Sequence, residues 1–155
     1  MRHAKSSWSD PFHEDAERPL NKRGFQAAAA MGRWLRRKAY LPDQALVSTS
    51  VRTRQTFDRL RLETVPHYQD ALYHASAETL LSHLRAATGQ VVLLIAHNPG
   101  IGDAAGRLVN GPVRHARFAD YPTCATLVVD FPGSWGEVSW GAGAVQDFLT
   151  PHDLA

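Results

Sequence analysis

Two arginines and two histidines stand where strands of the chain are expected to end. Arg2 and His3 open the sequence. Arg52 follows a short apolar run that ends at Ser48, and His97 comes directly after a second apolar run rich in β-branched residues. In α/β sheets ligands bind beyond the carboxyl ends of the strands, so these side chains are expected to form one cationic pocket. Guanidinium groups match phosphate oxygens in pairs, which favours a phosphoryl group as the ligand.

The elements that would position these side chains alternate between strands and helices. Helical spacing of apolar residues predicts helices over 23–39 and 101–109, and Ser50 and Ser76 are expected to cap two more. Three apolar runs have the length and composition of strands: 45–48, 91–96 and 125–131. The last of these is expected to form a hairpin with 137–140. This order predicts a three-layer α/β/α sandwich with a mostly parallel central sheet and an antiparallel edge.

Composition indicates one globular domain covering residues 1–155. The chain is 44% hydrophobic and its net charge is only +2, so nucleic acid is not an expected partner. No apolar run is long enough to span a membrane, and the N-terminus lacks the apolar core of a signal peptide. The expected compartment is therefore the cytoplasm. The single cysteine, Cys124, is expected to be a buried and unreactive thiol.

The other histidines and the tryptophans carry no comparable chemical pattern. No HxH or HExxH pair occurs, and one cysteine cannot build a thiolate zinc site, so no metal or other cofactor is expected. The four tryptophans are expected to pack in the interior rather than to line a ligand site. Arg18 is expected either to pair with Asp15 or to line the rim of the pocket, with the structural role favoured.

Five segments resemble motifs of the histidine phosphatase superfamily, which has a phosphoglycerate mutase-like fold, and they occur in that superfamily's order. The opening Arg2-His3-Ala4 resembles the Arg-His-Gly/Ala signature. The remaining segments resemble the short SixA-type phosphohistidine phosphatase branch: Arg18–Gly24 with its Arg-Pro-Leu start, Ser48–Thr56 with its Arg-x-x-Gln-Thr end, Leu94–Gly100 around the second histidine, and the tail Phe148–Leu154. The resemblance extends over nearly the whole chain.

The resemblance implies a role for each residue of the pocket. His3 would be the nucleophile and would become a phosphohistidine. Arg2 and Arg52 would bind the phosphoryl oxygens and stabilise their charge in the transition state, and His97 would donate to the same oxygens. These groups would supply the positive charge without a metal ion.

Two features of the resemblance remain open in the sequence. In larger members a carboxylic acid lies three residues before a tyrosine, and Asp70 has that spacing to Tyr73. Asp70 is either the proton donor to the leaving group or a residue that caps a loop. A central strand normally precedes the nucleophile, whereas His3 almost begins this chain. Either the natural chain starts upstream or the first strand is very short.

The expected function is hydrolysis of a phosphoryl group through a covalent intermediate on His3. The favoured substrate is a phosphohistidine on a protein, with a small phosphorylated molecule as the other partner class. The alternative is a phosphate- or phosphoprotein-binding module of the same fold that turns over weakly. A mutase is less favoured, because 57–75 is short for the insertions that would enclose its substrate. The oligomeric state is left undetermined.

Overall fold

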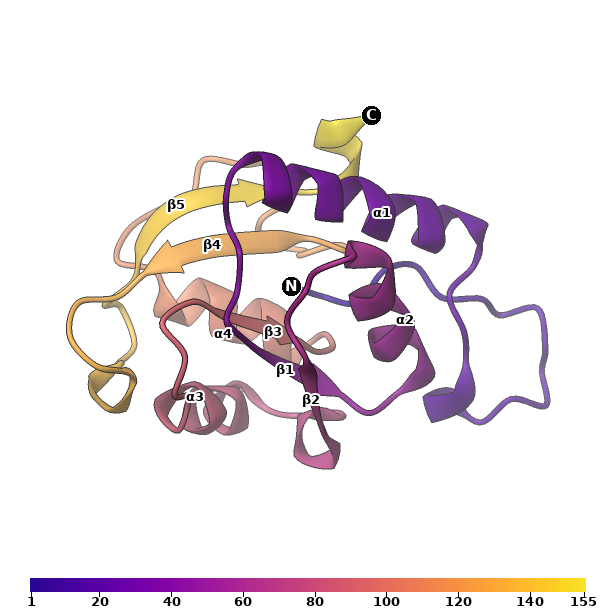
Figure 1. Cartoon of the computed structure of the whole chain (residues 1–155), viewed down its shortest axis with the longest axis horizontal. Coiled ribbons are helices and arrows are strands. Elements are labelled where there is room, and N and C mark those ends of the chain that lie inside the picture. Colours follow the sequence, from indigo (N-terminus) through magenta and orange to yellow (C-terminus); the bar gives the residue numbers. More distant parts are fainter.

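The computed structural model describes residues 1–155, and helices and strands alternate through most of the chain (Figure 1). Its α-helices are α1 (Lys22–Arg37), α2 (Val51–Leu60), α3 (Ala77–Arg85) and α4 (Gly100–Leu108). Its strands are β1 (Gln44–Ser48), β2 (Pro66–Gln69), β3 (Val92–Ile95), β4 (Thr126–Asp130) and β5 (Ala144–Leu149). Four short 3₁₀ helices complete it: η1 (Asp15–Glu17), η2 (Asp70–Leu72), η3 (Trp135–Glu137) and η4 (Pro151–Leu154).

The first residues of the chain join two groups of strands. One group is parallel with the order β2-β1-β3, and the other is the antiparallel pair β4-β5. The segment Met1–His3 lies between them: the Arg2 N–H donates to the Ala125 carbonyl at 3.0 Å, and the His3 N–H donates to the Ala96 carbonyl at 3.1 Å. Figure 1 accordingly shows the N-terminus near the centre of the molecule. His3 is thus held by backbone hydrogen bonds on both sides.

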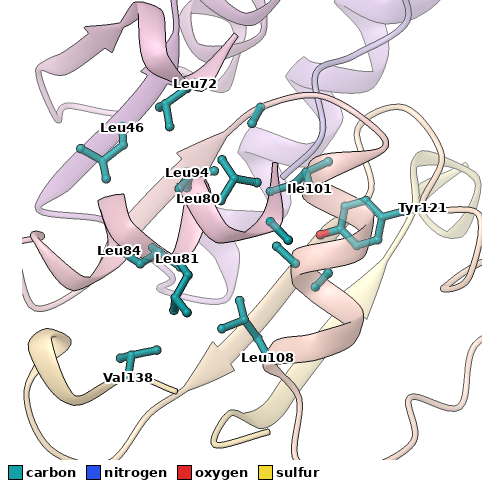
Figure 2. Close-up of a cluster of buried hydrophobic side chains, with 14 of the residues drawn as sticks. Leu46, Leu72, Leu80, Leu81, Leu84, Leu94, Ile101, Leu108, Tyr121 and Val138 are labelled. Atoms are coloured by element: carbon teal, nitrogen blue, oxygen red, sulfur yellow. The ribbon is translucent and has the colours of Figure 1, made fainter. Parts of the chain in front are cut away.

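Alternating side chains of the strands pack against helices on opposite faces of the sheet. Leu46 and Leu94 belong to a buried cluster with residues of α3 and α4, which Figure 2 shows together with Tyr121. Val47 and Ile95 belong to a second cluster with residues of α1 and α2. The two clusters on either face of one central layer confirm the predicted α/β/α architecture, which is a mixed α/β fold with a parallel central sheet.

An apolar cavity of about 310 Å³ lies beside the short N-terminal segment. Met1, β3 and β4 line it, together with apolar residues of α3 and α4. The Met1 amino group donates to the Leu94 carbonyl at 2.9 Å, and its burial lowers the pKa of this group to about 5. The amino terminus is therefore a buried polar group at the edge of an apolar space.

Most of the predicted elements are confirmed within a few residues. The predicted helix over 23–39 is α1, and the helix over 101–109 is α4. Ser50 and Ser76 do cap α2 and α3, since each hydroxyl accepts the N–H of the residue three positions later. Cys124 is fully buried, as expected. No helix combines the length and the apolar character that crossing a membrane would require.

The predicted hairpin is wrong in its second strand. The partner of β4 is β5, whereas 135–137 forms η3. Ser134 and Glu137 close a capping box around this turn, and the Trp135 indole N–H donates to the Gly89 carbonyl at 2.6 Å. These contacts hold 135–138 against α3 instead of along β4. The strand β2 was not anticipated either.

One of the four tryptophans does not pack in the interior. Trp34 is buried, and Trp135 and Trp140 pack against the cluster of α3 and α4. Trp8 is 76% exposed, and the Arg18 guanidinium lies over its ring at 3.5 Å from the ring centroid. The prediction of a packing role is therefore wrong for Trp8, whose ring stacks on a cation at the surface.

Candidate active site

His3 is a buried histidine whose ring is fixed in one tautomer. Its Nδ1 lies 2.7 Å from the Ala4 carbonyl oxygen. Because a carbonyl only accepts, Nδ1 carries the hydrogen and Nε2 keeps its lone pair. Burial, with a smaller effect from the nearby charges of Arg52 and Arg2, lowers the pKa of His3 to about 4. At neutral pH this ring is therefore uncharged, with Nε2 free to attack an electrophile.

His97 follows β3 and lies beside His3, with 5.2 Å between the ring centroids. Its Nδ1 accepts from the Arg52 guanidinium at 3.3 Å, because arginine has no acceptor. Its Nε2 therefore carries the hydrogen and donates to the Ser48 hydroxyl at 2.7 Å. Burial, followed by the proximity of His3 and Arg52, lowers the pKa of His97 to about 3. Both histidines of the site are consequently neutral.

Two guanidinium groups supply the positive charge of the site. Arg52 is almost fully buried, and Arg2 donates through Nη1 to the Tyr121 carbonyl at 3.1 Å. The Nε atoms of both arginines are buried and have no hydrogen-bond partner. Burial lowers the pKa of Arg2, and the charge of Arg52 adds to this effect, which places the two cations near each other. Unpaired buried donors of this kind are costly unless an anion accepts from them.

Helix α2 holds both Arg52 and the segment that carries His3. Ser50 caps its first turn and so places Arg52 at the start of the helix, beyond the end of β1. One turn later, the Thr56 hydroxyl accepts the Ala4 N–H at 2.9 Å. Gln55 accepts the Leu20 N–H at 2.8 Å. The Arg-x-x-Gln-Thr motif thus has a structural explanation, because its last two residues fasten two other segments of the site to α2.

Asp15 is the acidic residue of the site, although the sequence pattern pointed to it only as a partner of Arg18. Its carboxylate accepts from Arg52 at 3.0 Å and from Arg18 at 3.2 Å, and its backbone carbonyl accepts a second Arg52 hydrogen bond at 2.6 Å. The Tyr73 hydroxyl also donates to it. The hydrogen bond from Tyr73 has the largest effect, and together with those from the two arginines it holds the pKa of Asp15 far below its usual range. Asp15 therefore orients the Arg52 fork, and the structural role expected for Arg18 is confirmed.

Tyr73 and His74 form a rim of the site that sequence reasoning missed. The Tyr73 ring meets the His97 ring edge-on at 5.3 Å, and burial raises the pKa of its hydroxyl. His74 Nε2 lies 3.7 Å from the Asp15 carboxylate. The only indication in the sequence was that a histidine follows the tyrosine whose spacing to Asp70 had been noted.

The structure does not bring Asp70 into this cluster. Asp70 is the exposed first residue of η2, and its side chain makes no hydrogen bond or ion pair. By contrast, Arg2, His3, Arg52 and His97 do converge, as their positions at strand ends predicted. The catalytic roles of all five residues remain predictions.

The arrangement as a whole combines a neutral imidazole nitrogen with two cations, the buried Arg52 and the half-buried Arg2. It therefore suits capture of a dianionic phosphoryl group more than binding of a neutral ligand. No group of three or more histidine, cysteine or acidic side chains is arranged to hold a metal ion.

The chain is similar to one known protein family and to a mycobacterial protein. Residues 1–73 match the histidine phosphatase superfamily (branch 1). An uncharacterised protein of Mycobacterium tuberculosis is 31% identical over 159 aligned residues, which cover 98% of this chain and all of that protein.

Two solved structures have the same fold over nearly their full length. One, from Agrobacterium tumefaciens, is described as a candidate phosphohistidine phosphatase SixA. It is 32% identical, with a TM-score of 0.83 over 97% of this chain and 95% of that one. The other, from Nakamurella multipartitia and described in the same way, is 26% identical. Its TM-score is 0.86, over 97% of this chain and 93% of that one.

Proposed function

Because the chain belongs to the histidine phosphatase superfamily, we propose that it hydrolyses phosphohistidine on proteins through a covalent intermediate on His3. The observation that carries this proposal is the state of the His3 ring. Nε2 is unprotonated and lies in a site with two guanidinium groups, each of which has a buried and unpaired Nε. An unprotonated ring nitrogen beside two cations is the arrangement that this reaction needs.

The chemistry divides into two transfers. In the first, His3 Nε2 attacks phosphorus, and the bond from phosphorus to the leaving group breaks. In the second, water attacks the phosphohistidine, and inorganic phosphate leaves while the ring regains its lone pair. Arg2 and Arg52 stabilise the charge on the equatorial oxygens in both transition states, since their positions are fixed before the reaction begins. No metal ion is required in this scheme.

Support for a protein substrate comes from the rim of the site and from the relatives. Between α2 and α3 the chain forms only β2, η2 and short connections, so little of it is available to enclose a small metabolite. A phosphorylated side chain presented by another folded protein brings its own contact surface to such a site. Two proteins of the same fold are described as candidate phosphohistidine phosphatases.

Acid-labile labelling tests the proposal directly. The protein is mixed with a histidine-phosphorylated carrier protein that bears radioactive phosphate, quenched within milliseconds to seconds, and separated by denaturing electrophoresis at alkaline pH. Wild type should carry base-stable, acid-labile label and release phosphate, and both should be lost in His3→Ala. His67→Ala is the matched control, because His67 is an exposed histidine on β2.

The same assay separates the proposal from its alternatives. Label that persists on His3→Ala would contradict the assignment of the nucleophile. Tight binding of the carrier without label or phosphate release would favour a binding module instead. Turnover should continue in excess EDTA, and a loss that a divalent ion restores would contradict the metal-free scheme.

A further inference from the structure

We propose that His74 is the proton donor to the leaving group in this site. The proposal rests on the proposed function, because it names the acid for the transfer of the phosphoryl group to His3. It stands on a juxtaposition of side chains from three parts of the chain. His74 lies on the rim formed with Tyr73, its ring centroid is 6.0 Å from that of His97, and its Nε2 faces the carboxylate that orients Arg52.

The position of His74 suits a group that must meet the leaving side of the substrate. The nucleophile is buried, whereas the His74 side chain is 63% exposed. A phosphoryl group held between the buried cations and His3 would therefore direct its leaving group outward, towards the rim. The His74 ring lies against the Tyr73 ring, with 4.0 Å between the centroids and an angle of 47° between the ring planes, which limits where its nitrogens can lie.

The backbone at His74 is itself unusual. Its φ is 55°, in the left-handed region that few residues other than glycine adopt. Such conformations cluster at functional sites when the surrounding structure holds them in place. Here α4 provides that support, because a Cβ at Gly100 would overlap the Ala75 carbonyl oxygen. The tight contact fixes the backbone of Ala75, directly after His74.

The groups that face His74 are poor proton donors at neutral pH. His97 is neutral, because its pKa is lowered to about 3, and Asp15 is a carboxylate with a strongly lowered pKa. The Tyr73 hydroxyl keeps its proton, since burial raises its pKa, and it donates a hydrogen bond to Asp15. Arg52 is a permanent cation. Histidine is the side-chain type that most often serves as a general acid or base, and His74 is the histidine on this rim.

The proposed transfer balances as follows. As the bond between His3 Nε2 and phosphorus forms and the bond from phosphorus to the leaving nitrogen breaks, the His74 imidazolium gives its proton to that nitrogen. Neutral His74 then takes a proton from the attacking water, the new P–O bond forms and the His3–phosphorus bond breaks. The Asp15 carboxylate, 3.7 Å from His74 Nε2, pairs with the imidazolium when it is present.

The experiment compares leaving groups in a variant that keeps the backbone. Asparagine tolerates the left-handed region, so His74→Asn removes the acid without straining the turn. Pre-steady-state formation of labelled His3 is measured with 2,4-dinitrophenyl phosphate, whose leaving group needs no proton, and with phenyl phosphate and the phosphohistidine carrier, whose leaving groups do. Asp70→Asn is measured beside it, because Asp70 is the other candidate acid that the sequence offers, four residues away, and its side chain makes no hydrogen bond or ion pair.

His74→Asn is expected to slow labelling from phenyl phosphate and the carrier by roughly a hundredfold, and from dinitrophenyl phosphate by less than about threefold. The alkaline limb of the kcat/KM profile of wild type on phenyl phosphate should disappear in this variant. Equal losses on all three substrates, or no loss, would overturn the proposal, as would the selective loss occurring in Asp70→Asn. In those cases His3 of the wild-type protein would still become labelled. If the proposed function itself is wrong, the wild-type protein carries no label with any of the three substrates.

Discussion

The two ends of the segment Met1–Ala4 lie in opposite environments. At one end, His3 lies in the site with Arg2 and Arg52, whose buried Nε atoms have no partner. At the other end, the Met1 amine borders an apolar cavity of about 310 Å³. Both regions contain polar groups with unfavourable desolvation, yet only the first arranges them around a point where an anion can bind. Buried polar groups that surround one point can bind an anion there, whereas an isolated one, such as the Met1 amine, only lowers the free energy of unfolding.

The largest effect is expected at the cationic end, from Arg52→Lys. A lysine ammonium cannot copy the paired hydrogen bonds of a guanidinium to a phosphoryl group. We expect kcat/KM on the phosphohistidine carrier to fall about a hundredfold or more, which corresponds to roughly 3 kcal/mol of transition-state stabilisation. Steady-state kinetics measure this loss. Arg59→Lys, an exposed change on the same helix, is the control and should match wild type. A kcat/KM of Arg52→Lys within threefold of wild type would contradict a role for Arg52 in binding the phosphoryl group.

Acidification should destabilise both ends, in different pH ranges. The folded state lowers the pKa of the Met1 amine from 8.0 to about 5 and that of His3 from 6.5 to about 4. In both cases the unfolded chain binds a proton at a higher pH than the folded chain does, so the free energy of unfolding decreases as pH falls. The amine contributes between about pH 8 and 5 and His3 between about pH 6.5 and 4, with a total loss on the order of 2 kcal/mol or more.

Urea unfolding across this pH range distinguishes the two contributions. N-terminal acetylation should flatten the upper part of the curve, because it removes the ionisable amine. His3→Ala should flatten only the lower part, where His97 continues to contribute. A curve that stays unchanged in both proteins would mean that neither group is desolvated in the folded state.

The smallest effect is expected at the apolar end, from a designed extension. In β3, the Leu94 carbonyl points away from β1 and accepts from Met1. Because backbone groups two residues apart in a strand point to the same side, the N–H and C=O of Val92 also point towards this edge. Four β-branched residues added before Met1 should continue the short segment along this edge. We expect the free energy of unfolding to rise by roughly 1–2 kcal/mol, from buried apolar area and backbone pairing.

A matched extension of glycine, serine and proline provides the control for that gain. It also moves the amine away from the Leu94 carbonyl, but it cannot form a strand or fill the cavity. Denaturant unfolding measures both proteins, and phosphate release should differ little between them. An equal change in stability for the two extensions would attribute the gain to the amine alone.

The helices that frame the site were accessible from local sequence patterns. The caps at Ser50 and Ser76 and the apolar spacing of α1 and α4 depend on neighbours three or four residues away, which a sequence displays directly. The hairpin was not accessible in this way. Whether 137–140 or β5 pairs with β4 depends on the contact of Trp135 with Gly89, which are far apart in the chain.

By itself, the sequence determined that Arg2, His3, Arg52 and His97 would meet, because parallel strands end at one edge of a sheet and each of these residues follows or opens such an element. It did not determine the tautomer of His3, the neutral state of His97, or the cluster of Asp15, Tyr73 and His74. Those depend on burial and on contacts between η1, α2 and the end of η2. Desolvation and long-range hydrogen bonds exist only once the chain is folded, so only the tertiary structure could decide them.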